Sequence, residues 1–160
     1  MRHERSIRGF TLVELCSVLV IAGILAAIAG PRFLDTPAFN QRGYTDELAG
    51  AIRSAEAAAT ASGCYVQLTI NPGTGYDAEL PASGAPCSGA YIVPVSRIDG
   101  APLAGAPPSN ADVSASAVLL LDPKGPVTGP SSISVVGSPS GSTLPLTLQI
   151  DPLSGFVTVP

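Results

Sequence analysis

The stretch GFTLVELCSVLVIAGILAAIAG, residues 9–30, decides the fold class of this chain. As a helix, residues 10–30 would rise about 31 Å, which matches the roughly 30 Å hydrocarbon core of a bilayer. The basic residues Arg2, Arg5 and Arg8 precede the run, and such residues hold an N-terminus in the cytoplasm. A cleaved secretory signal is the alternative, but the run is long for a signal peptide and lacks a convincing small-residue cleavage site. We therefore expect a single-pass membrane helix.

One acidic residue, Glu14, lies inside this apolar run. An acidic side chain within a bilayer costs about 2.5 to 3.5 kcal/mol, so Glu14 needs a positively charged partner. If the chain were cut after Gly9, Phe10 would supply a free α-amine. Two unit charges about 4 Å apart at an effective dielectric near 20 attract by roughly 4 kcal/mol, which offsets the cost. The amine of a neighbouring subunit would serve equally well.

The segment GFTLVE, residues 9–14, resembles the cleavage and methylation motif of type IV prepilins and pseudopilins. The resemblance implies that a prepilin peptidase cuts after Gly9 and methylates the new N-terminal Phe10. It also implies that Glu14 helps to dock the subunit into a growing filament. Pro31 fits the family as well, because the long N-terminal helix often bends or melts at such a proline. A proline at that position removes one helix hydrogen bond and can kink the helix.

An amphipathic helix is expected over residues 35–63. The apolar residues that recur there at helical spacing are Leu48, Ile52, Ala55 and Ala59. Residues with this spacing share one helix face, which would pack against a sheet. Gly63 is placed to end the helix. Pro37 and Gly43 predict an irregular junction, with a bent or broken helix rather than one straight rod.

From Cys64 onward, apolar and polar residues alternate with a period of two, which is typical of half-buried strands. The segments expected to form strands are 64–70, 76–80, 90–96, 117–121, 132–136, 146–150 and 156–159. The segment 100–117 is rich in Pro, Ala, Ser and Gly and is expected to be a loop or a surface insertion.

The fold class is therefore α+β, with a long N-terminal helix packed on an antiparallel sheet, as in pilins. We expect a leader peptide over residues 1–9 and a transmembrane helix segment over residues 10–34. The amphipathic helix of residues 35–63 would follow, and residues 64–160 would form a β-rich periplasmic or extracellular domain.

Four further segments make the resemblance narrower. Residues 42–44, residues 46–48 with Arg53, and residues 61–64 are similar to minor pilins of the mannose-sensitive haemagglutinin type, which resemble the H pseudopilin of type II secretion. Residues 119–125, LLLDPKG, are similar to a strand and turn common in that group. The resemblance implies a minor pilin or pseudopilin, a structural subunit of a pilus or pseudopilus. Its implied partners are other subunits, the prepilin peptidase, the inner-membrane assembly platform and membrane lipid.

The cysteines are Cys16, Cys64 and Cys87. The expected orientation puts Cys64 and Cys87 on the outer, oxidising side of the membrane, so we expect them to form a disulfide. Closing that loop would stabilise a small domain by roughly 3 kcal/mol. Two free thiols remain the alternative. Cys16 is expected to face lipid or a neighbouring helix as a small apolar residue.

Charge and composition argue against several other functions. The formal net charge is -4, which leaves no basic surplus for general nucleic-acid binding. The single histidine, His3, lies in the leader, so a catalytic triad or a His-rich zinc site has almost no material. The acidic residues show no metal-binding spacing, and we expect no cofactor, no metal and no enzymatic activity. A tip-displayed binding module, for adhesion or DNA uptake, and a membrane-tethered enzyme are the competing hypotheses.

Overall fold

The computed structural model describes residues 11–29, 36–83, 87–137 and 144–159, without the side chains of residues 26–29, 36 and 37. The chain divides into two compact units, residues 1–35 and residues 36–160.

Helix α1, Leu12–Ala29, forms the first unit. Thr11 begins it, since the Glu14 amide donates to Thr11 Oγ1 (3.2 Å) and the Leu15 amide donates to the Thr11 carbonyl (3.1 Å). Its described side chains are all exposed. Within the described residues, no helix is both long enough and apolar enough to cross a membrane. The expected span of residues 10–34 lies partly outside the described residues, so it stays a prediction.

Helix α2, Thr36–Ser62, is continuous over 27 residues, so neither Pro37 nor Gly43 interrupts it. The expected irregular junction with the membrane segment falls on residues 30–35, which lie outside the described residues, and stays a prediction. Pro37 lies in the first turn, where a backbone N–H would have no helical partner, and therefore costs no hydrogen bond. Gly43 is accommodated within the helix. Gly63 follows the helix with a φ of 70°, and its amide donates to the Ala59 carbonyl (2.9 Å).

Two antiparallel sheets follow α2 along the chain. In the first, the strand order is β3-β2-β1-β6-β7, and β4 also pairs with β2. Its strands are β1 Val66–Asn71, β2 Gly75–Ser83, β3 Ser88–Pro94, β4 Ala104–Gly105, β6 Ala117–Leu121 and β7 Val127–Thr128. In the second, the order is β10-β9-β8-β5. Its strands are β5 Ala111–Val113, β8 Ser132–Gly137, β9 Leu146–Ile150 and β10 Val157–Thr158.

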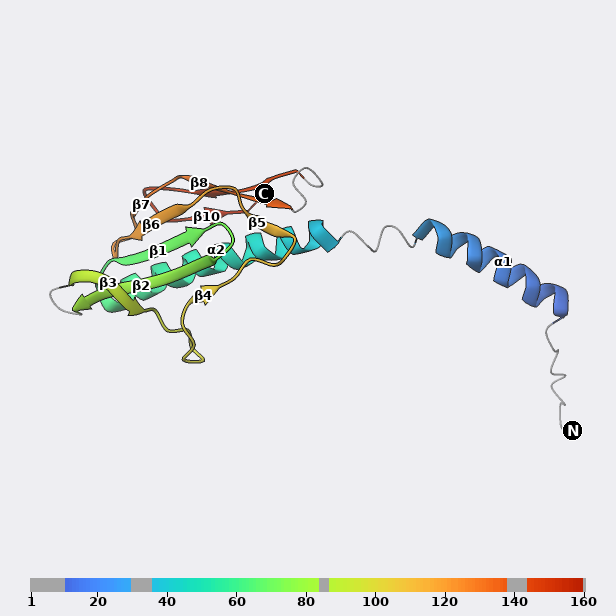
Figure 1. Cartoon of the computed structure of the whole chain (residues 1–160), viewed down its shortest axis with the longest axis horizontal. Coiled ribbons are helices and arrows are strands. Elements are labelled where there is room, and N and C mark those ends of the chain that lie inside the picture. Colours follow the sequence, from blue (N-terminus) through green and yellow to red (C-terminus); the bar gives the residue numbers. More distant parts are fainter. Residues whose placement is uncertain (1–10, 30–35, 84–86, 138–143, 160) are drawn as a thin grey trace, which may run out of the picture. The chain divides into compact units, whose positions relative to one another are not determined.

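Both sheets pack on α2, which lies along them in Figure 1. The helix residues buried in this core include the expected face, Leu48, Ile52, Ala55 and Ala59. From the sheets, the core receives inward side chains such as Leu68, Leu119, Val135 and Leu148. Every buried hydrophobic residue of the described chain lies in the unit of residues 36–160. The expected α+β class, with a helix packed on antiparallel strands, is confirmed.

The expectation of a loop over residues 100–117 is wrong in part. Ala104 and Gly105 form β4 and pair with Asp77 and Tyr76 of β2. A second short strand in this segment, β5, pairs with β8. β4 is held by backbone pairing and β5 by pairing and burial, rather than by propensity, which is why the Pro- and Ala-rich sequence did not indicate them. The short β7 was also not expected.

Candidate assembly site

Glu14, the residue predicted to dock the subunit, lies in the first turn of α1. The positive end of the helix dipole favours a carboxylate at this position. Its carbonyl accepts a hydrogen bond from Ser17 Oγ (2.8 Å). Gly9, Phe10 and Pro31 lie outside the described residues. The pairing of Glu14 with the Phe10 amine therefore stays a prediction.

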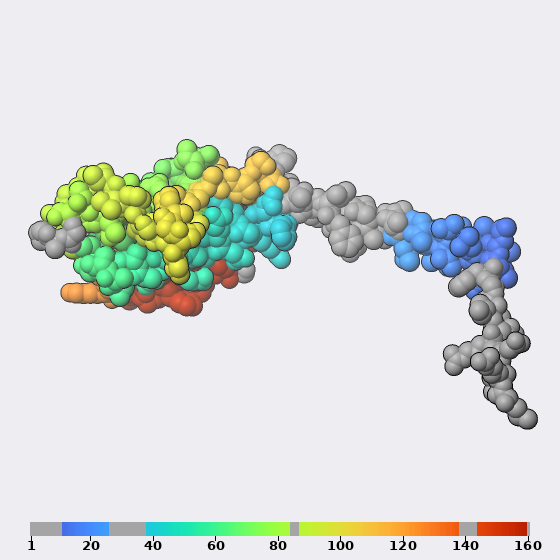
Figure 2. Space-filling model, turned by 90° about the horizontal axis from the view of Figure 1, so that it is seen from below, coloured from blue at the N-terminus to red at the C-terminus, as the bar shows by residue number. Residues whose placement is uncertain are grey.

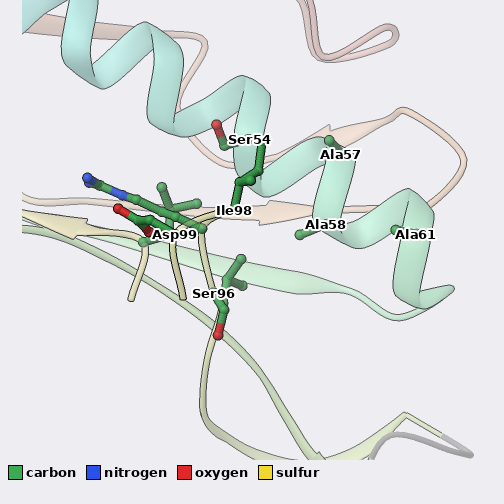
Figure 3. Close-up of a pocket in the computed structure, with 10 residues that line it drawn as sticks. Ser54, Ala57, Ala58, Ala61, Ser96, Ile98 and Asp99 are labelled. Atoms are coloured by element: carbon green, nitrogen blue, oxygen red, sulfur yellow. The ribbon is translucent and has the colours of Figure 1, made fainter. Parts of the chain in front are cut away.

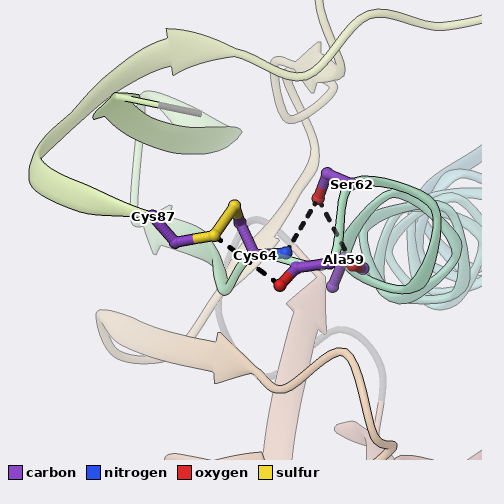
Figure 4. The surroundings of a disulfide bond; sticks show 5 residues. Ala59, Ser62, Cys64 and Cys87 are labelled. Atoms are coloured by element: carbon purple, nitrogen blue, oxygen red, sulfur yellow. Dashed lines mark hydrogen bonds between the residues drawn. A yellow bond between two sulfur atoms is a disulfide. The ribbon is translucent and has the colours of Figure 1, made fainter. Parts of the chain in front are cut away.

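The predicted disulfide joins Cys64 and Cys87, whose Cα atoms are 5.4 Å apart, so the alternative of two free thiols is wrong. Figure 4 shows Cys64 just after the end of α2 and Cys87 reaching it from beside β3. Cys87 has a φ of 59°, and its Sγ lies 3.6 Å from the Gly63 carbonyl oxygen. The bond ties the edge of the first sheet to the end of the helix.

A polar network joins α2, β2 and the segment before β4. The Tyr76 hydroxyl donates to Glu47 Oε1 (2.8 Å), and Arg97 Nη2 donates to the Tyr76 hydroxyl (3.1 Å) and to the Ala104 carbonyl (2.8 Å). Burial, and then the hydrogen bond to Glu47, raises the pKa of Tyr76 to about 12. Gly105 packs so closely that a methyl group there would lie 2.5 Å from Glu47 Oε1. The network therefore fixes β4 against the helix.

This network was not predicted from the sequence. Its members come from segments far apart in the chain, and neither periodicity nor spacing brings them together. The one available signal was the isolated pair of charged residues Arg97 and Asp99 within an otherwise apolar and small-residue segment.

Two buried polar residues near the start of α2 differ in their partners. Gln41 Nε2 donates to the carbonyls of Val135 (2.8 Å) and Leu144 (2.9 Å), which joins the helix to the second sheet. Within the described residues, the buried Tyr44 hydroxyl has no hydrogen-bond partner. Burial raises the pKa of Tyr44 to about 12, helped by the negative charges of Asp112 and Glu47.

A groove of about 690 Å³ separates α2 from the loop between β3 and β4 (Figure 3). Its helix side consists of small residues, Ser54, Ala57, Ala58 and Ala61. The charged groups on its loop side have partners within the fold, because Asp99 Oδ1 accepts from the Ala101 amide (3.0 Å) and Arg97 belongs to the polar network. The lining provides packing surface rather than a nucleophile with a base.

The described part of the chain contains no assembled metal site. No group of three or more His, Cys, Asp or Glu side chains gathers there where it could hold an ion.

The architecture of the described residues defines the structural class of the chain. It is an α+β unit of one helix on two antiparallel sheets, preceded along the chain by a separate apolar helix.

Comparison with known proteins narrows this class. Over 53 residues the chain is 53% identical to the type IV narrow pilus major component PilA5 of Thermus thermophilus. The match covers 33% of this chain and 46% of the relative, so the chain spans less than half the length of that curated relative. The matched part of the chain is therefore similar to a type IV pilin.

Two other comparisons give no match. No protein-family model matches the chain. No solved structure matches it either. The narrower resemblance to haemagglutinin-type minor pilins and to the H pseudopilin stays a prediction.

Proposed function

We propose that this chain is a structural subunit of a type IV pilus or of the related pseudopilus of type II secretion, and that it transforms no substrate. The 53% identity to a type IV pilus component carries the proposal. The architecture supports it, because a separate apolar helix precedes a helix packed on antiparallel sheets. The narrower resemblance favours a minor pilin or pseudopilin, whereas the matched relative is named as a major component. The subunit role is common to both.

The maturation that we propose follows from residues 9–14. A prepilin peptidase would cut between Gly9 and Phe10 and methylate the new N-terminus. Before assembly, the chain would be a single-pass inner-membrane protein with a cytoplasmic N-terminus and a periplasmic α+β unit. The assembly platform would then move the mature subunit into the filament.

The exposed apolar surface of α1 supports this role. Its described side chains from Leu12 to Leu25 are exposed on all sides of the helix, and such a helix is stable only when it is buried. Lipid would cover it before assembly, and neighbouring apolar helices would cover it afterwards. In that setting the Glu14 carboxylate requires a positive partner, which the Phe10 amine of an adjacent mature subunit would supply.

A test of the subunit role follows from Glu14. In cells that carry the peptidase and the assembly machinery, we expect the chain in sheared, purified filaments. Glu14→Leu should insert and be processed normally, since it makes α1 more apolar, yet its content in filaments should fall at least tenfold. Val13→Leu, one residue away, is the matched control and should assemble like the parent.

Two results would contradict the subunit role or the charge pairing of Glu14. If the parent chain is processed and yet absent from every filament fraction, the subunit role is wrong. If Glu14→Leu assembles as well as Val13→Leu, the charge-pairing argument fails.

A further inference from the structure

One end of the α+β unit exposes two large apolar side chains near the start of α2. Phe39 is 78% exposed and Leu144 is 87% exposed. Gln41 holds them at the same end, because it belongs to the same helix turn as Phe39 and its Nε2 donates to the Leu144 carbonyl (2.9 Å). Single exposed apolar residues are normal on protein surfaces, but here two lie at one end of the unit. We call the surface formed by Phe39 and Leu144 the Phe39 end.

A second exposed pair lies on the hairpin between β9 and β10. Leu153 is 82% exposed and Phe156 is 64% exposed. Both line a hollow of about 450 Å³. The turn is held firmly, since Asp151 Oδ1 accepts from the amides of Leu153 (2.8 Å) and Ser154 (3.2 Å). We call the surface formed by Leu153 and Phe156 the Phe156 end. Because the turn is held by these hydrogen bonds, the surface is preorganised for binding.

The two ends lie far apart along α2. A methyl group on Gly155 would lie 2.6 Å from Glu56 Oε1, which places the hairpin beside the turn of α2 that carries Glu56. At 1.5 Å per residue, Glu56 lies about 25 Å along the helix from Phe39. Figure 2 shows α2, cyan to green, running across this face between the yellow segment and the red C-terminal strands.

The charged residues at the two ends have opposite signs. Arg42 lies three residues after Phe39, hence beside it on the helix surface, and makes no ion pair or hydrogen bond with another described residue. Asp151 lines the hollow at the Phe156 end. Hydrogen bonds from the Leu153 and Ser154 amides lower the pKa of Asp151, so its carboxylate is charged at neutral pH.

Other charged groups lie near both ends. Asp46 lies one helix turn after Arg42 and shares a hollow with it. The turn that carries Asp122 and Lys124 lies beside the hairpin, because the Val127 amide donates to the Pro152 carbonyl (3.0 Å). The Asp122 carboxylate is already bonded to the Tyr65 hydroxyl (2.9 Å) and to the Lys124 amide (2.8 Å). One end thus carries Arg42 with Asp46, and the other carries the acidic Asp151 and Glu56 with Lys124.

We propose that the Phe39 end of one copy of this chain docks on the Phe156 end of a second copy, with Arg42 facing Asp151. The contact joins two different surfaces of one molecule, so it is heterologous and leaves a free end after each addition. Repetition with a rotation therefore builds an open helical filament. This inference rests on the proposed function, because it names the surfaces through which consecutive subunits would meet.

Site-directed crosslinking tests the docking without removing either apolar pair. Gly43 lies one turn after Phe39, and its added side chain would meet no atom within 4 Å. Ser154 is exposed between Leu153 and Phe156. In a Cys16→Ser background, the combined Gly43→Cys and Ser154→Cys chain should give a ladder of multimers when its filaments are treated with a short bis-maleimide. Either single variant should give no ladder.

A second variant measures how much the contact contributes to assembly. Phe156→Ser should lower incorporation into filaments at least tenfold. Val118→Ser removes another exposed apolar side chain, on β6, and should assemble like the parent.

The possible failures are distinguishable. Filaments that contain the double-cysteine chain but give no ladder would overturn the docking and leave the subunit role intact. A crosslinked product of a different size would assign the contact to another subunit, which also overturns docking between copies. A parent chain that enters no filament would overturn the proposed function itself.

Discussion

Two buried tyrosines show how a single hydroxyl group decides the stability of a site. Tyr44 and Tyr76 are similarly buried and both lie near Glu47. The Tyr76 hydroxyl has partners on both sides, whereas the Tyr44 hydroxyl has none within the described residues. Removing a bonded buried group leaves its partners unsatisfied, while removing an unbonded one does not.

We therefore expect opposite effects from the same substitution. Tyr76→Phe should lower the free energy of unfolding by about 1 to 2 kcal/mol, because Glu47 and Arg97 lose a partner. Tyr44→Phe should leave it unchanged or raise it. Urea unfolding of residues 36–160, which contain every buried hydrophobic residue of the described chain, gives both values. Equal losses for the two variants would contradict the assigned hydrogen bonds.

The same tyrosines predict how stability depends on alkaline pH. Both have a folded-state pKa of about 12, above the ordinary tyrosine value of 10.0. The folded state therefore keeps these protons in a range where the unfolded state loses them. Stability should be constant below about pH 10 and should fall between about pH 10 and 12. Tyr76→Phe should flatten this fall in unfolding curves measured across that range, and an unchanged slope would rule out Tyr76 as a cause.

At the residue scale, the sequence was informative where chemistry leaves few choices. Cys64 and Cys87 were the only cysteines expected outside the membrane, so their pairing could be predicted. The contact of Glu47 with Tyr76 and Arg97 could not be, because it depends on how β2 and the following loop return to the helix. The exposure of Phe39 and Phe156 was also inaccessible, since an apolar residue is normally expected in a core.

At the scale of elements, a glycine affects stability in opposite ways in α2 and in β4. Gly50 lies inside α2, and an added methyl group would meet no atom within 4 Å. Gly105 lies in β4, where the same methyl group would lie 2.6 Å from the Tyr76 ring and 2.5 Å from Glu47 Oε1. The first glycine weakens a helix, and the second permits close packing.

Alanine should accordingly stabilise one site and destabilise the other. Gly50→Ala should raise the free energy of unfolding by about 0.5 to 1 kcal/mol, as expected for a helix interior. Gly105→Ala should lower it by about 1 to 3 kcal/mol through overpacking. Thermal unfolding of both variants beside the parent measures the two shifts. A stabilised Gly105→Ala would show that β4 does not pack closely on the network.

The elements that sequence predicts best are those with a long periodic pattern. The buried face of α2 followed from Leu48, Ile52, Ala55 and Ala59. Its expected bounds, residues 35–63, agree with the observed Thr36–Ser62 to within one residue at each end, and Pro37 in the first turn costs no hydrogen bond. The short strands β4, β5 and β7 carry too few residues to show alternation, and their pairing is decided by the rest of the fold.

At the scale of the whole molecule, the two units have different roles in the proposed filament subunit. The apolar helix α1 has no core of its own, whereas the α+β unit contains the buried residues and the disulfide. In our account, processing at Gly9 frees the amine that Glu14 requires, and the α+β unit meets its neighbours through its two ends. The first step depends on maturation of the N-terminus.

The intact mass of the chain isolated from cells that contain the prepilin peptidase tests this account most directly. We expect the mass of a chain that begins at Phe10 and carries one added methyl group. Gly9→Val, which places a bulky side chain at the cleavage position, should keep the mass of the full precursor. A parent chain that retains residues 1–9, or that begins at any residue other than Phe10, would contradict the assignment to the pilin class.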